Sequence, residues 1–353
     1  MPERRERALD IASRARAEAV LAAHPSTVAW LTGYVADIET GPSPFALSPL
    51  ALVAGGGPPT LVVSRDEEEA AAATGCAVVS YPGFGLGPMN PVEGAAEALE
   101  RTVGGRMVAT EPGALPASLA ARVSWVDAAA ELAAARAIKE PDEIEKLRRA
   151  IALCDTGQKE ARARAAPGVS EIELWADVRA AIEVAAGGRT PLLADLVSGP
   201  RTEEIGGSPG ERTLTEGELV LCDLVPRRDG YWGDSCATIA LGEPNATARR
   251  KHRAVREALE RTVEAVRPGL RAGDLDELAR SGLDYPHHTG HGLGTAWHEE
   301  PRIVPGGKTV LEPGMVIALE PGAYADGEGV RVEQVVLIGE DGCEVLSGHE
   351  LEL

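Results

Sequence analysis

The chain has 353 residues, enough for two domains with cores of their own, and its 35 Lys and Arg residues against 55 Asp and Glu residues give a formal charge of −20. Such a charge repels nucleic acid and anionic membrane surfaces, which excludes both as expected partners. No apolar run is long enough to cross a membrane, no secretory signal opens the chain, and the five cysteines form no C-x-x-C pair, so we expect a cytoplasmic protein with reduced thiols.

The first third of the chain has the pattern of an α/β layer. Residues 2–23 place apolar side chains among arginines and glutamates, which predicts one amphipathic helix. Short apolar runs bounded by glycine and proline then alternate with alanine-rich helical stretches. These runs predict strands at 27–34, 51–54, 61–64, 77–81 and 107–110.

A second region begins near residue 133. A charged helical stretch runs from Glu131 through Lys139, and a new helix then opens at Pro141. Asp142 is placed to cap this helix, with Glu145 three residues further on. We therefore expect two domains, 1–132 and 133–353.

The second region contains one order of elements twice. A helix over 142–165 ends at Pro-Gly 167–168, and a helix over 246–266 ends at Pro-Gly 268–269, 101 residues later. Each is followed by a second helix, the first of which opens with a capping box of Ser170 and Glu173.

Similar offsets recur in two pairs of acids. Asp223 and Glu320, 97 residues apart, each stand six residues after a glycine at the end of an apolar strand. The strands that return carry Asp234 and Glu333, 99 residues apart. Offsets that agree this closely favour a duplicated helix–helix–hairpin unit.

Four acids beside apolar strands predict a metal site. An ionised carboxylate removed from water must be paired or must bind a metal, and folding the two repeats together brings Asp223, Asp234, Glu320 and Glu333 to one point. Hard oxygen ligands in this number favour two divalent ions that activate a water. The alternative is that each acid is an exposed strand or turn residue, and Asp234, after Gly233, is the strongest case for it.

The segment HHTGHGLGTAWHEEP, residues 287–301, holds four of the seven histidines. His291 stands between two glycines and is the candidate metal ligand. His287 and His298 are candidates to donate hydrogen bonds to a substrate carbonyl or to its tetrahedral intermediate. His288 is interpreted as structural.

These motifs together resemble a known family. The pattern Asp223-x10-Asp234, the block HTGHGLG-x3-HEEP, the stretch EPGAY ending at Tyr324 and the stretch GVRVE ending at Glu333 are similar to the metallopeptidases of the "pita-bread" fold. That group includes Xaa-Pro dipeptidase (prolidase), aminopeptidase P and methionine aminopeptidase, with the metal-free creatinase as a relative. WLTGY near residue 30 and AIKEPDEIEKLRRA at the junction resemble the creatinase-type amino-terminal domain and its linker.

The resemblance implies an α+β fold, with a creatinase-like α/β amino-terminal domain followed by a pseudo-twofold pita-bread catalytic domain. It implies that Asp223 binds one metal, that Asp234 and Glu333 bridge two, and that His291 and Glu320 complete the shell of the other. Glu320 would also be the base, with His298 and His287 holding the carbonyl. Arg331 and Tyr324 would orient the ligands; the alternative for Arg331 is a surface ion pair.

One departure from the family stands in the loop before the first acid strand. The family has a histidine there, and Gly206 stands in its place. The missing imidazole normally helps to seat the substrate, so turnover or substrate shape is expected to differ. Arg201, Glu203 and Glu204 are nearby candidates to replace it.

The resulting hypothesis is a cytoplasmic dinuclear metallopeptidase, with manganese or else cobalt, zinc or iron, that cleaves the bond before proline in Xaa-Pro dipeptides. The candidate loop for capping the free amino end is 37–45, supplied by a neighbouring subunit of a homodimer. The alternatives are an aminopeptidase P acting on longer Xaa-Pro-Xaa peptides, a metal-free creatinase-like hydrolase and a non-catalytic peptide binder.

Overall fold

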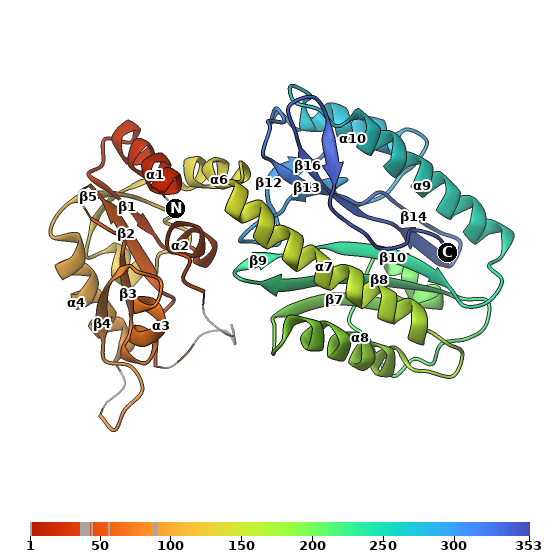
Figure 1. The fold of residues 1–353 in the computed structure, drawn as a ribbon, viewed down its shortest axis with the longest axis horizontal. Coiled ribbons are helices and arrows are strands. Elements are labelled where there is room, and N and C mark those ends of the chain that lie inside the picture. The colour runs from red at the N-terminus through yellow and green to blue at the C-terminus, as the bar shows by residue number, and fades with distance from the viewer. Residues whose placement is uncertain (1, 36–42, 44, 56, 88–89) are drawn as a thin grey trace. The chain divides into compact units, whose positions relative to one another are not determined.

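The computed structural model describes residues 2–35, 43, 45–55, 57–87 and 90–353. The chain divides into two compact units, Met1–Arg136 and Ala137–Leu353 (Figure 1). No helix in the described part of the chain has the length and apolar character needed to cross a membrane. The candidate capping loop 37–45 lies outside the described residues except at Ser43 and Phe45.

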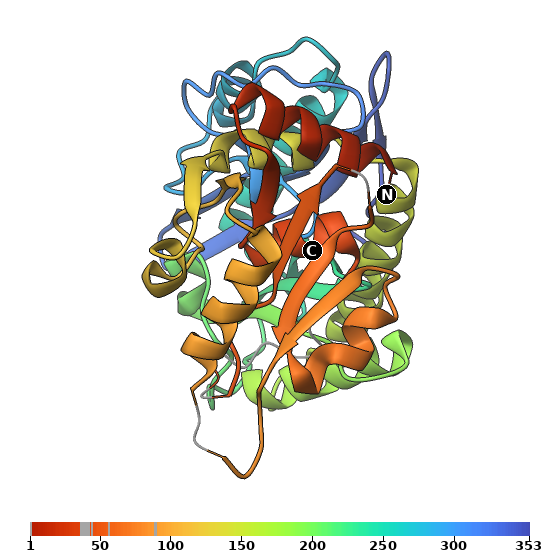
Figure 2. The same ribbon diagram turned by 90° about the vertical axis from the view of Figure 1, so that its left-hand side faces the viewer.

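The first unit is a six-stranded sheet with helices on both faces, seen in Figure 2. The strand order is β4-β3-β2-β1-β5-β6. Its strands are β1 Ala19–Ala22, β2 Leu50–Ala54, β3 Thr60–Ser64, β4 Ala77–Tyr81, β5 Met107–Thr110 and β6 Ser124–Asp127. Its helices are α1 Pro2–Arg14, α2 Pro25–Thr32, η1 Arg65–Glu67, α3 Glu68–Ala72, α4 Pro91–Val103, α5 Ala117–Ala120 and α6 Ala129–Ala137, whose last residue belongs to the second unit.

Strand alternation builds two separate cores in this unit. Val20 and Ala22 of β1 pack with α1, α2 and α6 on one face, whereas Ala19 and Leu21 pack with α4 and α5 on the other. A strand buried on both faces is apolar at every position, and β1 is.

Two predictions for this unit are wrong. Residues 2–23 are not one helix, because α1 ends at Arg14 and residues 19–22 form a central strand. Residues 27–34 are not a strand but belong mostly to α2, which begins at Pro25 and ends before Gly33 in the left-handed conformation. Short apolar runs of this kind do not distinguish a buried helix from a buried strand.

The second unit consists of two helix pairs and two main sheets. One sheet has the order β10-β8-β7, with β9 paired to β8, and the other has the order β12-β11-β13-β16-β17. The helices are α7 Pro141–Arg164, α8 Glu171–Ala186, η2 Gly199–Glu204, α9 Ala246–Ala265 and α10 Ala272–Arg280. The strands are β7 Leu192–Ser198, β8 Leu219–Arg228, β9 Tyr231–Trp232, β10 Ser235–Ala240, β11 Gly290–Gly292, β12 Glu299–Ile303, β13 Val316–Leu319, β14 Gly322–Ala325, β15 Glu328–Arg331, β16 Gln334–Ile338 and β17 Cys343–Val345.

Matching hydrogen bonds confirm that this unit is built from a repeat. Gly168 N donates to Leu214 O at 2.9 Å, and Gly269 N donates to Leu311 O at 2.9 Å. The two repeats also have equivalent antiparallel pairs, β8 with β10 and β13 with β16. In Figure 1 the pair α7 and α8 lies along one sheet, and the pair α9 and α10 lies along the other.

Two details of the second region differ from the prediction. The residue that caps α7 is Glu140, paired with Glu143 in a capping box, rather than Asp142, because Pro141 is already the first helical residue and Asp142 lies inside the helix. Asp223 does not end its strand, since β8 continues to Arg228. Each of the acids Asp234 and Glu333 stands directly before a return strand, at equivalent places in the two repeats.

Candidate metal and active site

Three carboxylates from the two repeats meet inside the second unit. Asp223 lies in the middle of β8, Asp234 precedes β10, and Glu333 precedes β16. One carboxylate oxygen of each lies within 4.8 Å of the others. Glu333 N donates to Cys236 O at 3.0 Å, so the two hairpins are joined directly beside the cluster.

Burial makes this cluster unfavourable as three anions. Asp234 is 4% and Glu333 1% exposed, and desolvation together with the neighbouring acids raises the pKa of both well above its usual range. Desolvation also raises the pKa of Asp223, to about 6, although Arg331 opposes the shift. Asp234 and Glu333 therefore hold protons that a cation can replace.

His291 adds a nitrogen ligand to this cluster. Its Nδ1 lies 2.9 Å from Gly292 O, which assigns the proton to Nδ1 and leaves the lone pair on Nε2. Nε2 lies 3.5 Å from both Asp234 Oδ2 and Glu320 Oε1. Desolvation lowers the pKa of His291 to about 3, so the ring is neutral at pH 7. A neutral lone pair that faces two carboxylates fits a metal ion between them.

The donor set as a whole fits divalent cations. Oε1 of Glu333 is buried without a hydrogen-bond partner among the described residues, which is an oxygen left for a cation to bind. Four carboxylates and one imidazole are the hard and intermediate ligands of such ions. The five predicted ligands are thus brought together.

Arg331 bonds to one of the predicted ligands, and Tyr324 bonds to Arg331. Arg331 is 3% exposed and donates to Asp223 Oδ2 at 2.6 Å. Its Nη1 donates to Tyr324 Oη at 3.2 Å and to Ile205 O at 2.7 Å. The alternative of a surface ion pair for Arg331 is therefore wrong.

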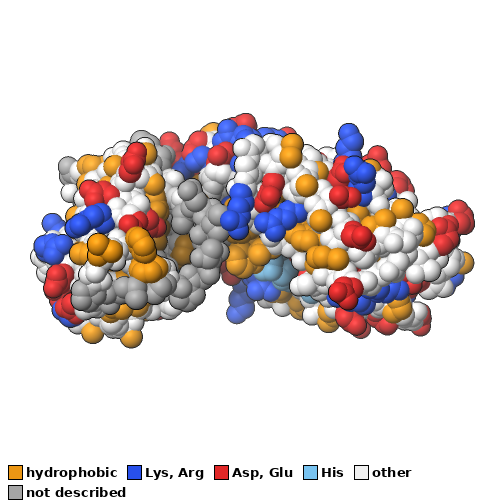
Figure 3. All heavy atoms as spheres, turned by 90° about the horizontal axis from the view of Figure 1, so that it is seen from below, with side chains coloured by type: hydrophobic (Ala, Val, Ile, Leu, Met, Phe, Trp, Pro, Cys, Tyr) orange, Lys and Arg blue, Asp and Glu red, His pale blue; other side chains and the backbone are white. Residues whose placement is uncertain are grey.

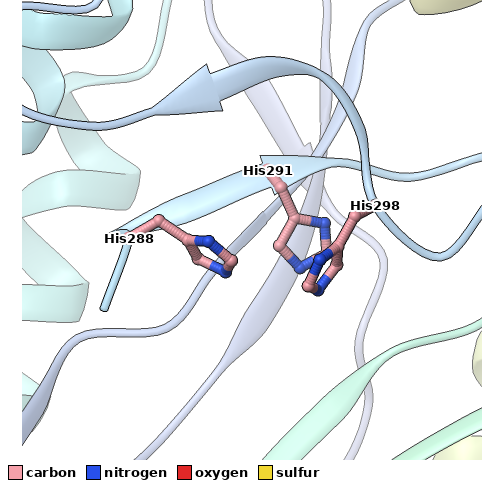
Figure 4. Close-up of side chains that lie close together, drawn as sticks. All are labelled: His288, His291 and His298. Atoms are coloured by element: carbon pink, nitrogen blue, oxygen red, sulfur yellow. The ribbon is translucent and has the colours of Figure 1, made fainter. Parts of the chain in front are cut away.

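Three histidine rings border the carboxylates. Ring nitrogens of His288, His291 and His298 lie within 4.8 Å of one another, and Figure 4 shows the rings converging from β11, the segment before it and the loop after it. His298 is exposed and its ring has no hydrogen-bond partner among the described residues, which leaves it free for a ligand. His287 instead contacts Tyr324 Oη at 2.9 Å and His288 O at 2.8 Å.

His288 is a residue of this site that sequence reasoning missed. Its Nε2 lies 2.8 Å from Glu320 Oε1, and Arg302 donates to its Nδ1 at 3.0 Å. Desolvation raises the pKa of Glu320, but the bond from His288 and the charge of Arg331 outweigh it and lower that pKa to about 2. His288 stands three residues before His291, and this spacing was the signal that could have identified it. The neighbouring His287 is the predicted candidate instead.

Other missed residues support the site from outside it. Lys139 Nζ lies 3.0 Å from Glu299 Oε2 in a pair whose side chains are each 1% exposed. Glu299 also accepts from Ala296 N at 3.0 Å, so this pair anchors the loop that carries His298. Figure 3 shows histidine side chains (pale blue) that reach the surface on one face of the molecule, with hydrophobic side chains (orange) beside them.

Comparison with known families decides the relationship of this chain. Residues 145–340, more than half of the chain, match the profile described as Metallopeptidase family M24. The chain belongs to this family. Residues 4–148 match the Creatinase/Prolidase N-terminal domain. The resemblance and the fold class predicted from the motifs are confirmed, and membership in a metallopeptidase family implies divalent metal ions.

Individual relatives are consistent with M24 membership. The "Probable dipeptidase PepE" of Mycobacterium tuberculosis is 36% identical over 227 residues, and the match spans 61% of this chain and 60% of that relative's length. The prolidase from Pyrococcus horikoshii OT3 is 26% identical with a TM-score of 0.86, covering 99% of each chain. The Xaa-Pro dipeptidase from Bacillus anthracis is 25% identical with a TM-score of 0.85, covering 100% of this chain and 99% of that one.

Proposed function

We infer that this chain is a dinuclear metallopeptidase that hydrolyses the bond before proline in Xaa-Pro dipeptides. The observation that carries the inference is the buried cluster of Asp223, Asp234 and Glu333, faced by the His291 Nε2 lone pair. The dipeptidase and prolidase names of its relatives support the choice of substrate. In this assignment residues 133–353 are the catalytic domain and 1–132 the amino-terminal domain.

Asp223, Asp234, His291, Glu320 and Glu333 would hold the metal ions. When bound, divalent cations at such ligands lower the pKa of a water and polarise a carbonyl. We assign manganese as the metal of the cell, because carboxylate oxygens with one imidazole suit it, with cobalt, zinc and iron as competitors.

The chain's own residues would move the protons. Glu320 is ionised and adjoins the cluster, so it can accept a proton from the attacking water and donate it to the leaving proline nitrogen. His298 has a free ring with which to donate to the scissile carbonyl oxygen, where negative charge develops. His287 would do the same after exchanging its bond to Tyr324.

The proposal extends to the setting of the enzyme. We propose a cytoplasmic homodimer, since the thiols are unpaired and the family is often dimeric. The imide bond before proline lacks an N–H, which excludes peptidases that need one and leaves a distinct role for this enzyme.

Peptide hydrolysis with added manganese tests the function. Leu-Pro and the tripeptide Leu-Pro-Gly are compared by proline or leucine release, with Glu320→Gln as the variant that lacks the base. We expect cleavage of Leu-Pro in excess of the tripeptide and loss of both activities in Glu320→Gln. Preference for the tripeptide would favour the aminopeptidase P assignment, and bound metal without turnover would favour the peptide binder. Turnover without metal would favour the creatinase-like hydrolase.

A further inference from the structure

The space beside Gly206 is filled by an acid from the neighbouring strand. A Cβ placed on Gly206 would collide with Oδ2 of Asp195, so the carboxylate of Asp195 occupies the place that a side chain at position 206 would need. Two of the three candidates suggested by the sequence are engaged elsewhere, since Arg201 pairs with Glu171 and Glu203 accepts from Gly327 N. The third, Glu204, is exposed. Asp195 was not among them.

Asp195 faces the metal-binding carboxylates. It lies on the edge strand β7 directly opposite Asp223 in the antiparallel register, and Asp223 in turn lies opposite Cys236. Directly opposite residues project from the same face of a sheet, with Cβ atoms about 5 Å apart. Asp195 is therefore one strand away from a predicted metal ligand, on the face that lines the site.

Among the described residues, the Asp195 carboxylate has no hydrogen-bond or ion-pair partner. It is half-buried, so it is reachable from solvent yet partly shielded from it. Two positions along the same face stands Leu193, a large apolar side chain that is 43% exposed. An unpaired acid next to exposed apolar surface matches a long basic side chain, which has an apolar stem and a cationic end.

The loop over Asp195 is held in a strained backbone geometry. Ile205 has φ of 78° and ψ of −47°, a combination that is costly for a β-branched residue. Its carbonyl accepts a 2.7 Å hydrogen bond from Arg331 Nη1, the same guanidinium that binds Asp223. Leu196 N donates to Gly207 O at 3.0 Å and ties the loop to β7. Strain that is held by the site itself indicates a functional arrangement of this loop.

We propose that Asp195 is a specificity-determining residue that selects substrates with a positively charged side chain before proline. The proposal rests on the proposed function. The carboxylate attracts a cationic side chain near the reacting bond and repels an anionic one, and Gly206 is needed because any side chain there would turn the carboxylate away.

Hydrolysis of three dipeptides of different charge tests the proposal. The ratio of kcat/KM for Lys-Pro to that for Glu-Pro is measured with manganese, with Leu-Pro as the neutral reference. For the unmodified enzyme we expect a ratio of about ten or more, since a single charge at a partly buried site has an effect of this size. Asp195→Asn keeps the shape and removes the charge, and it is expected to lower the ratio about tenfold, chiefly through KM.

Two further variants separate charge selection from general damage. Glu204→Gln removes the same charge from an exposed residue of the same loop and is expected to leave the ratio within about twofold. Gly206→Ala is expected to lower the ratio as Asp195→Asn does, and to have no further effect in an Asp195→Ala background.

The outcomes distinguish this proposal from the function on which it rests. If the enzyme cleaves all three dipeptides and Asp195→Asn leaves the ratio of Lys-Pro to Glu-Pro cleavage unchanged, the selection by Asp195 is overturned and the proposed function stands. An unmodified enzyme that prefers Glu-Pro would overturn the selection by Asp195 as well. If the metal-loaded enzyme cleaves none of the three, the proposed function fails and this inference fails with it.

Discussion

Arg331 Nη2 donates a hydrogen bond to Asp223 Oδ2 at 2.6 Å, although 108 residues separate the two in the chain. Arg331 belongs to the second repeat and Asp223 to the first. The bond places a buried cation against a predicted metal ligand and opposes the desolvation that raises the pKa of that carboxyl. The orientation of one repeat's ligand thus depends on a residue of the other.

Replacing this guanidinium by an amine weakens the metal site. Arg331→Lys keeps the charge, but a single ammonium group cannot replace the planar guanidinium, which donates hydrogen bonds to Asp223, Tyr324 and Ile205 at once. We expect metal affinity to fall about 10- to 100-fold, as is usual when a partner of a ligand is lost. Competition with a chromophoric chelator measures this, with the surface variant Arg271→Lys as control. Equal affinities of the two variants would contradict the role of Arg331.

Metal uptake is predicted to depend on pH and to release protons. Asp234 and Glu333 have raised pKa values in the metal-free protein, so a cation must displace their protons, and affinity falls as the pH is lowered. Calorimetry of manganese binding in buffers of different ionisation enthalpy counts these protons between pH 6 and 8. Binding without proton release over this range would refute the assignment of shared carboxylates.

Removing one of these acids should stabilise the metal-free protein. The folded-state pKa of Asp234 is raised, so its contribution to stability is fully present below the unfolded value near 3.8 and is lost as the pH rises through the folded value. Asp234→Asn cannot ionise. We expect its free energy of unfolding at pH 8 without metal to exceed that of the parent by about 0.5–2 kcal/mol. Urea titration measures this. The same variant should lose peptidase activity, and a destabilised metal-free variant would contradict the account.

The buried pair of Lys139 and Glu299 is expected to matter for both stability and turnover. Lys139→Met removes the cation from an acid whose side chain is 1% exposed, at a cost of about 3–5 kcal/mol. The loop carrying His298 loosens with it, because Glu299 also accepts from Ala296 N.

Denaturant unfolding of Lys139→Met measures the loss of stability, and its kcat measures the loss of turnover. The double variant Lys139→Met with Glu299→Gln is predicted to recover part of the lost stability, since no unpaired charge remains. A single variant as stable as the parent would show that the pair has no structural role.

The second unit, which holds the candidate metal site, was more predictable from sequence than the first. The repeat could be found because Pro-Gly stops and strand acids recur at nearly equal spacing, and the hydrogen bonds of Gly168 and Gly269 are indeed equivalent. Acids beside apolar strands are informative because burial without a partner is so unfavourable. The five predicted ligands lie together for this reason.

The errors arose where local patterns are ambiguous or where contacts are distant in sequence. Residues 19–22 are apolar at every position, so no periodicity separated a central strand from the end of a helix. The place of Asp195 depends on its register with Asp223, and the role of Lys139 depends on a partner 160 residues away. No pattern in the sequence around Asp195 or Lys139 predicts either contact.

Anomalous scattering from a crystal grown with manganese tests the central claim most directly. The account predicts two manganese peaks among the five predicted ligands, with Asp234 and Glu333 as the carboxylates next to both peaks. It also predicts that His291 Nε2 binds one of the two ions. The absence of anomalous density between these side chains, in crystals of enzyme that cleaves Leu-Pro, would contradict it.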